Sequence, residues 1–86
     1  MDAKHESRLN ELRISISELD EDIISLLEAR VSLAKEVGEI KKMYNKPIYV
    51  PELEKAKIEY LARKCNYPGL VEAIWPVIMC YTRTVE

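Results

Sequence analysis

The sequence has few of the residues that mark exported or metal-binding chains. It holds two cysteines, Cys65 and Cys80, and one histidine, His5, in an amino end that we expect to fray. The cysteines form neither a C-x-x-C pair nor a cysteine-rich framework, so we expect both to be reduced core residues of an intracellular protein. His5 has no metal-ligand partners nearby in the sequence, and we therefore expect no metal site.

Long apolar runs and an excess of one charge are also lacking. The longest uninterrupted apolar run, residues 73–80, is far shorter than the roughly 20 residues that span a bilayer, and the first 13 residues are charged rather than apolar. The 13 basic and 15 acidic residues are interleaved and leave no continuous basic face for a phosphate backbone. We expect a cytoplasmic chain without a membrane anchor or a nucleic-acid partner.

The first half of the chain contains little that would interrupt a helix. From about Ser7 to Tyr44 there is no proline and one glycine, Gly38. Apolar residues recur there at three-and-four spacing, which is typical of an amphipathic helix. Asn45 can adopt the left-handed conformation that ends a helix, and Pro47 prevents its continuation. The sequence therefore predicts one long helix.

Two further helices should follow. Pro51 suits the first position of a second helix, although Val50 before it is a poor N-cap, and this helix should run to about residue 64 or 65. After a turn at 66–69, a third helix over 70–86 is apolar nearly all round and should be mostly buried, with a kink or a restart at Pro76. There is no strand pattern. The predicted fold class is all-α, with three helices, a long first helix and one domain over residues 1–86.

The long helix also predicts an oligomer. At about 1.5 Å per residue it would be about 55 Å long, whereas a compact chain of this length has a radius of gyration near 12 Å. Its apolar stripe must extend beyond the rest of its own chain, and a second copy is the simplest cover. We therefore expect an intertwined helical homodimer.

Two cations interrupt the apolar seam of the first helix. Arg30 and Lys41 are eleven residues apart, so their side chains point within about 20° of each other and their Cα atoms lie about 16 Å apart. A buried unpaired charge costs several kcal/mol, so each cation needs an anionic partner. Either the side chains reach out from the edge of the seam to nearby acids, or they close on a small anion. Arg13 lies about 25 Å from Arg30 and could join it only from another copy.

Several segments resemble the all-helical AroQ-type chorismate mutases. They are Glu11-Leu12-Arg13, Leu19-Asp20, the stretches 24–30 and 33–41, and Lys46-Pro47-Ile48. The match is specific over residues 9–54 and weaker over the third helix. The resemblance implies an intertwined dimer of three-helix chains that converts chorismate to prephenate and needs no cofactor.

The resemblance also implies roles for residues of the first two helices. Chorismate carries two carboxylates and an enolpyruvyl ether, and its unimolecular rearrangement is helped by cations that hold it folded and stabilise negative charge on the ether oxygen. Arg30, together with Arg13 from the other subunit, would grip the carboxylates, and Lys41 would bridge a carboxylate and the ether oxygen. Glu54 would accept a hydrogen bond from the ring hydroxyl. A plainer interpretation of Glu54 is an acid favoured by the helix dipole.

Two positions on the third helix complete the expected site. Thr82 and Glu86 are four residues apart and fall where the family places a hydroxyl and a donor to the ether oxygen. Glu86 is also the last residue, where fraying is the default. A glutamate can donate only when it is protonated, so activity should be highest on the acid side.

Two departures from the family pattern leave other functions open. Where the family commonly has Asp-x-x-Arg-Glu, this chain has Val50 and Leu53 in place of the acid and the arginine. The loss of such a cation can cost about 10² to 10³ in rate, and Lys57 would substitute for it only partly. Chorismate mutase is the favoured hypothesis. The alternatives are a lyase that removes pyruvate from isochorismate, and a catalytically weak dimer that binds a dicarboxylate as a regulatory module.

Overall fold

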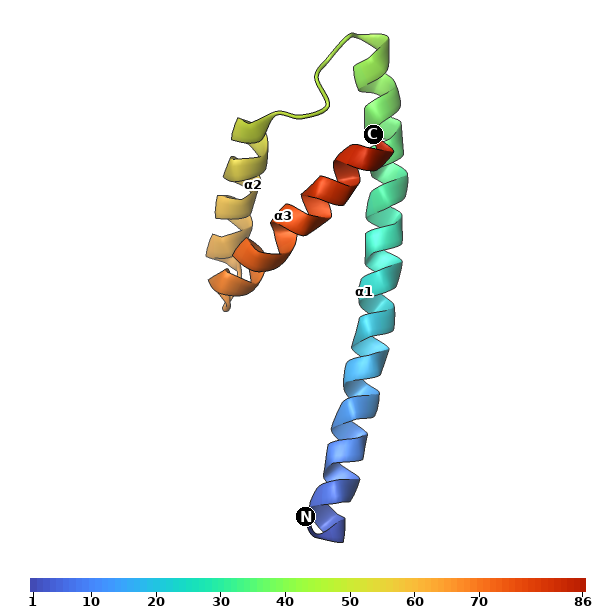
Figure 1. Cartoon of the computed structure of the whole chain (residues 1–86), viewed down its shortest axis with the longest axis vertical. Helices are drawn as coiled ribbons and strands as arrows, with labels where there is room; N and C mark the ends of the chain where they lie inside the picture. The colour runs from blue at the N-terminus through green and yellow to red at the C-terminus, as the bar shows by residue number, and fades with distance from the viewer. The chain divides into compact units, whose positions relative to one another are not determined.

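The computed structural model describes residues 1–86 and contains three helices and no strand. Helix α1 spans Ala3–Met43, α2 spans Pro51–Lys64 and α3 spans Pro68–Val85 (Figure 1). The chain divides into two compact units, residues 1–30 and 31–86, and α1 contributes to both. None of the helices combines the length and the apolar character that crossing a membrane requires. The predicted all-α class with a long first helix is confirmed.

Helix α1 begins earlier than the sequence pattern indicated, because Asp2 caps its amino end. The Asp2 carbonyl accepts a hydrogen bond from the Glu6 N–H at 3.0 Å, and its carboxylate Oδ1 accepts one from the His5 N–H at 2.8 Å. An aspartate at this position satisfies amide donors that would otherwise lack partners. The expectation of a frayed amino end around His5 is therefore wrong.

The end of α1 follows the predicted signals. Asn45 has a φ of 55°, the left-handed conformation expected after the last helical turn. The Lys46 N–H donates to the Lys41 carbonyl at 2.7 Å, and this bond closes the carboxyl end of the helix. Residues 44–50 then form the connection to α2.

Helix α2 begins at Pro51 as predicted, and Val50 provides no side-chain cap. The Val50 carbonyl instead accepts hydrogen bonds from the N–H groups of Leu53 and Glu54 at 3.1 and 3.2 Å. Because Pro51 has no N–H to satisfy, the first turn forms without a capping side chain.

Helix α3 differs from the prediction at two prolines. It begins at Pro68, so Pro68 and Gly69 belong to the helix and not to the preceding turn, because a proline at the first helical position loses no hydrogen bond. The helix also continues through Pro76, so the predicted restart is wrong, while a kink remains a prediction. The Glu72 carbonyl, which loses the amide of residue 76 as a partner, belongs to an exposed residue and can bond to water.

Burial within residues 31–86 is sparse. The buried residues are Ala34 and Gly38 on α1 and Val71 and Met79 on α3. Because α2 is the helix packed against α3, one side of α3 is covered and large apolar side chains such as Ile74 remain exposed. The prediction of a mostly buried third helix is wrong for the single chain. The cysteines are not core residues either, since Cys80 is exposed and Cys65 is half-buried.

The amino-terminal unit, residues 1–30, carries an uncovered apolar stripe. It consists of side chains that recur every three or four residues and are 43% to 59% exposed, namely Leu12, Ile16, Leu19 and Ile23. Such spacing places them on one face of a helix. The unit therefore exposes a continuous apolar face.

Candidate functional site

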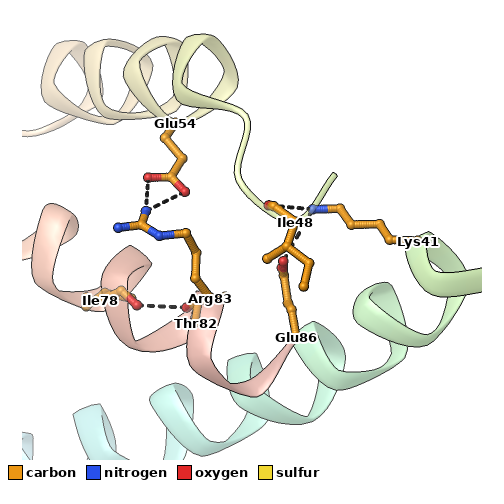
Figure 2. A network of polar contacts seen from close by, with 7 residues as sticks. All are labelled: Lys41, Ile48, Glu54, Ile78, Thr82, Arg83 and Glu86. Atoms are coloured by element: carbon orange, nitrogen blue, oxygen red, sulfur yellow. Dashed lines mark hydrogen bonds and ion pairs between the residues drawn. The ribbon is translucent and has the colours of Figure 1, made fainter. Parts of the chain in front are cut away.

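Lys41, near the end of α1, forms a salt bridge with Glu86, the residue after α3. Its Nζ donates to Glu86 Oε2 at 3.3 Å and to the Ile48 carbonyl at 3.1 Å (Figure 2). The side chains of Lys41 and Glu86 are 26% and 10% exposed. The expected anionic partner of Lys41 is therefore present, and it comes from a distant part of the sequence.

Gly38 permits this arrangement because it has no side chain. A Cβ at position 38 would lie 2.5 Å from the Glu86 carbonyl oxygen and 2.7 Å from the Glu86 Cα. The Glu86 N–H also donates to the Thr82 carbonyl at 3.1 Å, which extends the hydrogen bonding of α3 by one residue. Glu86 thus meets α1 in two ways, since its backbone lies against Gly38 and its side chain bonds to Lys41.

A recess of about 460 Å³ adjoins the salt bridge. Its lining consists of Gly38, Lys41, Lys42, Asn45, Lys46, Ile48 and Glu86. The lining carries three ammonium groups and one side-chain carboxylate, an excess of two positive side-chain charges. A positively charged concave surface attracts small anions, and a dianion would match this charge.

A second ion pair joins α2 to α3 in the same unit. Arg83 Nη1 donates to both oxygens of Glu54, at 2.5 and 2.7 Å, and the two side chains are 30% and 25% exposed. The guanidinium carbon lies 4.3 Å from the centre of the Tyr49 ring, within the range of a cation–π interaction. The hydrogen bond with Glu54 raises the pKa of Arg83 above its usual value, against a smaller opposing effect of desolvation.

Arg83 is not among the residues that the sequence predicts for the site. The sequence predicts Glu54 as an acid favoured by the helix dipole or as a ligand of the substrate hydroxyl, and in the structure Glu54 binds the Arg83 guanidinium. Leu53 is 68% exposed and contributes no charge to the site. No sequence spacing links positions 54 and 83, so only the packing of α2 on α3 reveals this pair.

The remaining predicted residues are distributed over both units. Thr82 is half-buried, and its hydroxyl donates to the Ile78 carbonyl at 2.8 Å within α3 (Figure 2). Arg30 is half-buried and Arg13 is exposed, and both belong to the amino-terminal unit. The structure therefore brings Lys41 and Glu86 into contact, and it places Glu54 and Thr82 in the same unit as that pair.

Comparison with known proteins identifies the class to which this fold belongs. Residues 12–86 match the family described as chorismate mutase type II, whose members are isomerases. The chain belongs to the chorismate mutase type II family. The family resemblance drawn from the sequence is thus confirmed. Because residues 1–11 lie outside the match, a single domain over residues 1–86 stays a prediction.

Three relatives illustrate the family. The chain is 49% identical over 55 residues to a bifunctional chorismate mutase/prephenate dehydratase of Aquifex aeolicus, which covers 64% of this chain and 15% of that protein. It is 39% identical over 67 residues to a chorismate mutase of Methanocaldococcus jannaschii, covering 78% of this chain and 68% of that one.

The third relative is a T-protein of Enterobacter agglomerans, 33% identical over 84 residues, or 93% of this chain and 22% of that protein. The chain thus spans less than a quarter of the length of the Aquifex and Enterobacter relatives. No solved structure matches the chain significantly.

Proposed function

We propose that this chain catalyses the pericyclic rearrangement of chorismate to prephenate, a step of aromatic amino-acid biosynthesis. The observation that carries the proposal is the recess beside Lys41 and Glu86, whose lining has an excess of two positive side-chain charges, in a chain of the chorismate mutase type II family. Chorismate is a dicarboxylate, so its charge complements that of the recess.

Lys41 suits the chemistry of this reaction. The rearrangement breaks the ether C–O bond and forms a C–C bond within one molecule, so it requires no nucleophile and no net proton transfer. An ammonium group has three donors, and two of those on Lys41 bind the Ile48 carbonyl and Glu86. These two bonds hold the nitrogen in place, and the third donor would stabilise the negative charge that develops on the ether oxygen.

The other predicted residues complete the proposed site. Arg30, with Arg13 of a second copy, would bind the two carboxylates of the substrate. Glu54 would accept a hydrogen bond from the ring hydroxyl, which is compatible with its bonds to Arg83 because a carboxylate has about four lone-pair sites. Thr82 would contact the substrate, and Glu86, when protonated, would donate to the ether oxygen.

A homodimer with shared sites is part of this proposal. The uncovered apolar stripe of the amino-terminal unit supports it, because a continuous exposed apolar face commonly marks a site of protein–protein interaction. A second copy that packs along this stripe would also supply Arg13. We expect no other macromolecular partner, neither nucleic acid nor membrane, and we expect the enzyme in the cytoplasm.

One observation favours a second candidate, a weakly active dimer that binds a dicarboxylate as a regulatory module. Glu86 already pairs with Lys41 and so competes with any substrate anion for this cation. Such a protein would bind chorismate and release no product. The third candidate, an isochorismate-pyruvate lyase, would use the same cations.

One set of incubations distinguishes the three candidates. The purified chain is supplied separately with chorismate and with isochorismate, while substrate absorbance, prephenate and released pyruvate are followed. A mutase converts chorismate to prephenate, a lyase releases pyruvate from isochorismate, and a regulatory module consumes neither. Lys41→Ala should abolish most turnover, whereas Lys35→Ala, a change at an exposed lysine of the same helix, should retain it.

A further inference from the structure

We propose that Arg83 is a further substrate-binding residue, which binds one carboxylate of the substrate while Glu54 holds its guanidinium in place. This inference rests on the proposed function. It starts from the position of the Arg83 side chain, which leaves α3 on the side that faces α2 and the connection between α1 and α2 (Figure 2). Glu86, one turn later, leaves α3 on the same side and reaches Lys41.

Three contacts fix the orientation of the Arg83 guanidinium. Nη1 bonds to both oxygens of Glu54, and the guanidinium carbon lies 4.3 Å from the centre of the Tyr49 ring. Charge-assisted hydrogen bonds and cation–π contacts each restrict a side chain that otherwise samples many rotamers. A cation that is already oriented loses less conformational freedom when it binds a ligand.

The same contacts leave most of the binding capacity of Arg83 unused. A guanidinium has five N–H donors, and the pair with Glu54 uses only those on Nη1. The Nε and Nη2 donors form an edge that matches the two oxygens of a carboxylate. The side chain is 30% exposed, so this group has access to the space beside α3.

Arg83 is also better suited than Lys57 to replace the positive charge that the family's arginine, Leu53 in this chain, would supply. Lys57 is exposed and forms no hydrogen bond or ion pair in the structure, so nothing orients its side chain. Arg83 and Lys41 each carry an acidic partner and lie in the same unit, on α3 and α1. Two oriented cations on different helices suit a ligand with two anionic groups.

The test combines a protein change with a ligand change. Chorismate and its two monomethyl esters, each lacking one carboxylate charge, are compared as substrates of the wild type, Arg83→Gln and Arg83→Lys. With the wild type, kcat/KM for either ester should fall by about 10- to 100-fold relative to chorismate. With Arg83→Gln, KM for chorismate should rise by about the same factor. The ester that lacks the carboxylate bound by Arg83 should then have nearly the same kcat/KM as chorismate.

The pattern of penalties separates binding from a purely structural role. If Arg83 only ties α3 to α2, Arg83→Gln lowers activity toward all three ligands alike and both ester penalties stay at their wild-type values, which would overturn the inference. Arg83→Lys keeps the charge and should show an intermediate penalty for the same ester. Arg63→Gln, a change at an exposed arginine of α2, should leave every ratio unchanged. Absence of wild-type turnover with chorismate would instead overturn the proposed mutase function, and this inference with it.

Discussion

The backbone of Glu86 lies against Gly38, so closely that a Cβ at position 38 would be 2.5 Å from the Glu86 carbonyl oxygen. The other glycine of the chain, Gly69, has open space where its Cβ would be. Both glycines lie within helices. A substitution by alanine therefore meets the Glu86 backbone at position 38 and open space at position 69, so the second variant is a control for the first.

Gly38→Ala should lower kcat/KM for chorismate by at least about tenfold, because the displaced Glu86 backbone moves the carboxylate away from Lys41, and small displacements in a site are costly. Gly69→Ala should keep full activity and stabilise the fold by up to about 1 kcal/mol through helix propensity. Steady-state kinetics and thermal unfolding of both variants test this. Equal activity in the two variants would show that the approach of Glu86 to Gly38 has no catalytic role.

Removal of Lys41 should affect both activity and stability. Lys41→Ala should reduce kcat/KM by at least about 10²-fold, because a donor to the developing negative charge is lost. It also leaves the carboxylate of Glu86, which is 10% exposed, without its cation, and should destabilise the fold by about 1 kcal/mol. The double variant Lys41→Met with Glu86→Gln should recover this stability but not the activity. Normal turnover in an unstable Lys41→Ala variant would mean that the residue is only structural.

Arg13 and Arg30 provide a test of the shared site. Arg13→Ala and Arg30→Ala should each be inactive as homodimers. After the two chains are refolded together, each mixed dimer should contain one complete site out of two, because one chain supplies Arg30 and the other supplies Arg13. The measurement is the activity of purified mixed dimers that carry two different affinity tags. Mixed dimers that form and remain inactive would refute the exchange of Arg13 between subunits.

Glu86→Gln tests whether Glu86 faces the ether oxygen. The amide has nearly the shape of the carboxylate and keeps an N–H donor, but it carries no negative charge. The variant should raise kcat/KM for chorismate severalfold, because a donor replaces a charge that repels the negative charge developing on the ether oxygen. Steady-state kinetics of the wild type and the variant measure this. Equal kcat/KM in the two proteins would place Glu86 outside the site.

The helix boundaries were predictable where local residues determine them. Asn45 and Pro51 each act through their own backbone, so the end of α1 and the start of α2 follow from the sequence. Asp2 was an equally local signal that the pattern of apolar residues obscured. Pro68 was ambiguous, because a proline suits both a turn and the first position of a helix.

The polar contacts of the site were predictable only in part. Lys41 stands out in the sequence because a cation interrupts an apolar seam, and this implied an acidic partner. The identity of that partner depends on how closely Glu86 approaches Gly38, which no local pattern encodes. Arg83 and Glu54 are 29 residues apart and lie on different helices, so their pairing depends on the packing of α2 against α3.

The two ion pairs have a consequence for competition among anions in the cell. Lys41 and Arg83 each hold a carboxylate that belongs to the same chain and is therefore present at a high effective concentration. Free chloride or phosphate can bind only the donors that these acids leave open, at one partly neutralised cation at a time. A ligand with two carboxylates at a suitable separation gains its second contact at no further cost in translational freedom. By neutralising part of each positive charge, the attached acids would weaken the binding of simple salts, whereas a dianion of suitable geometry would still gain both contacts.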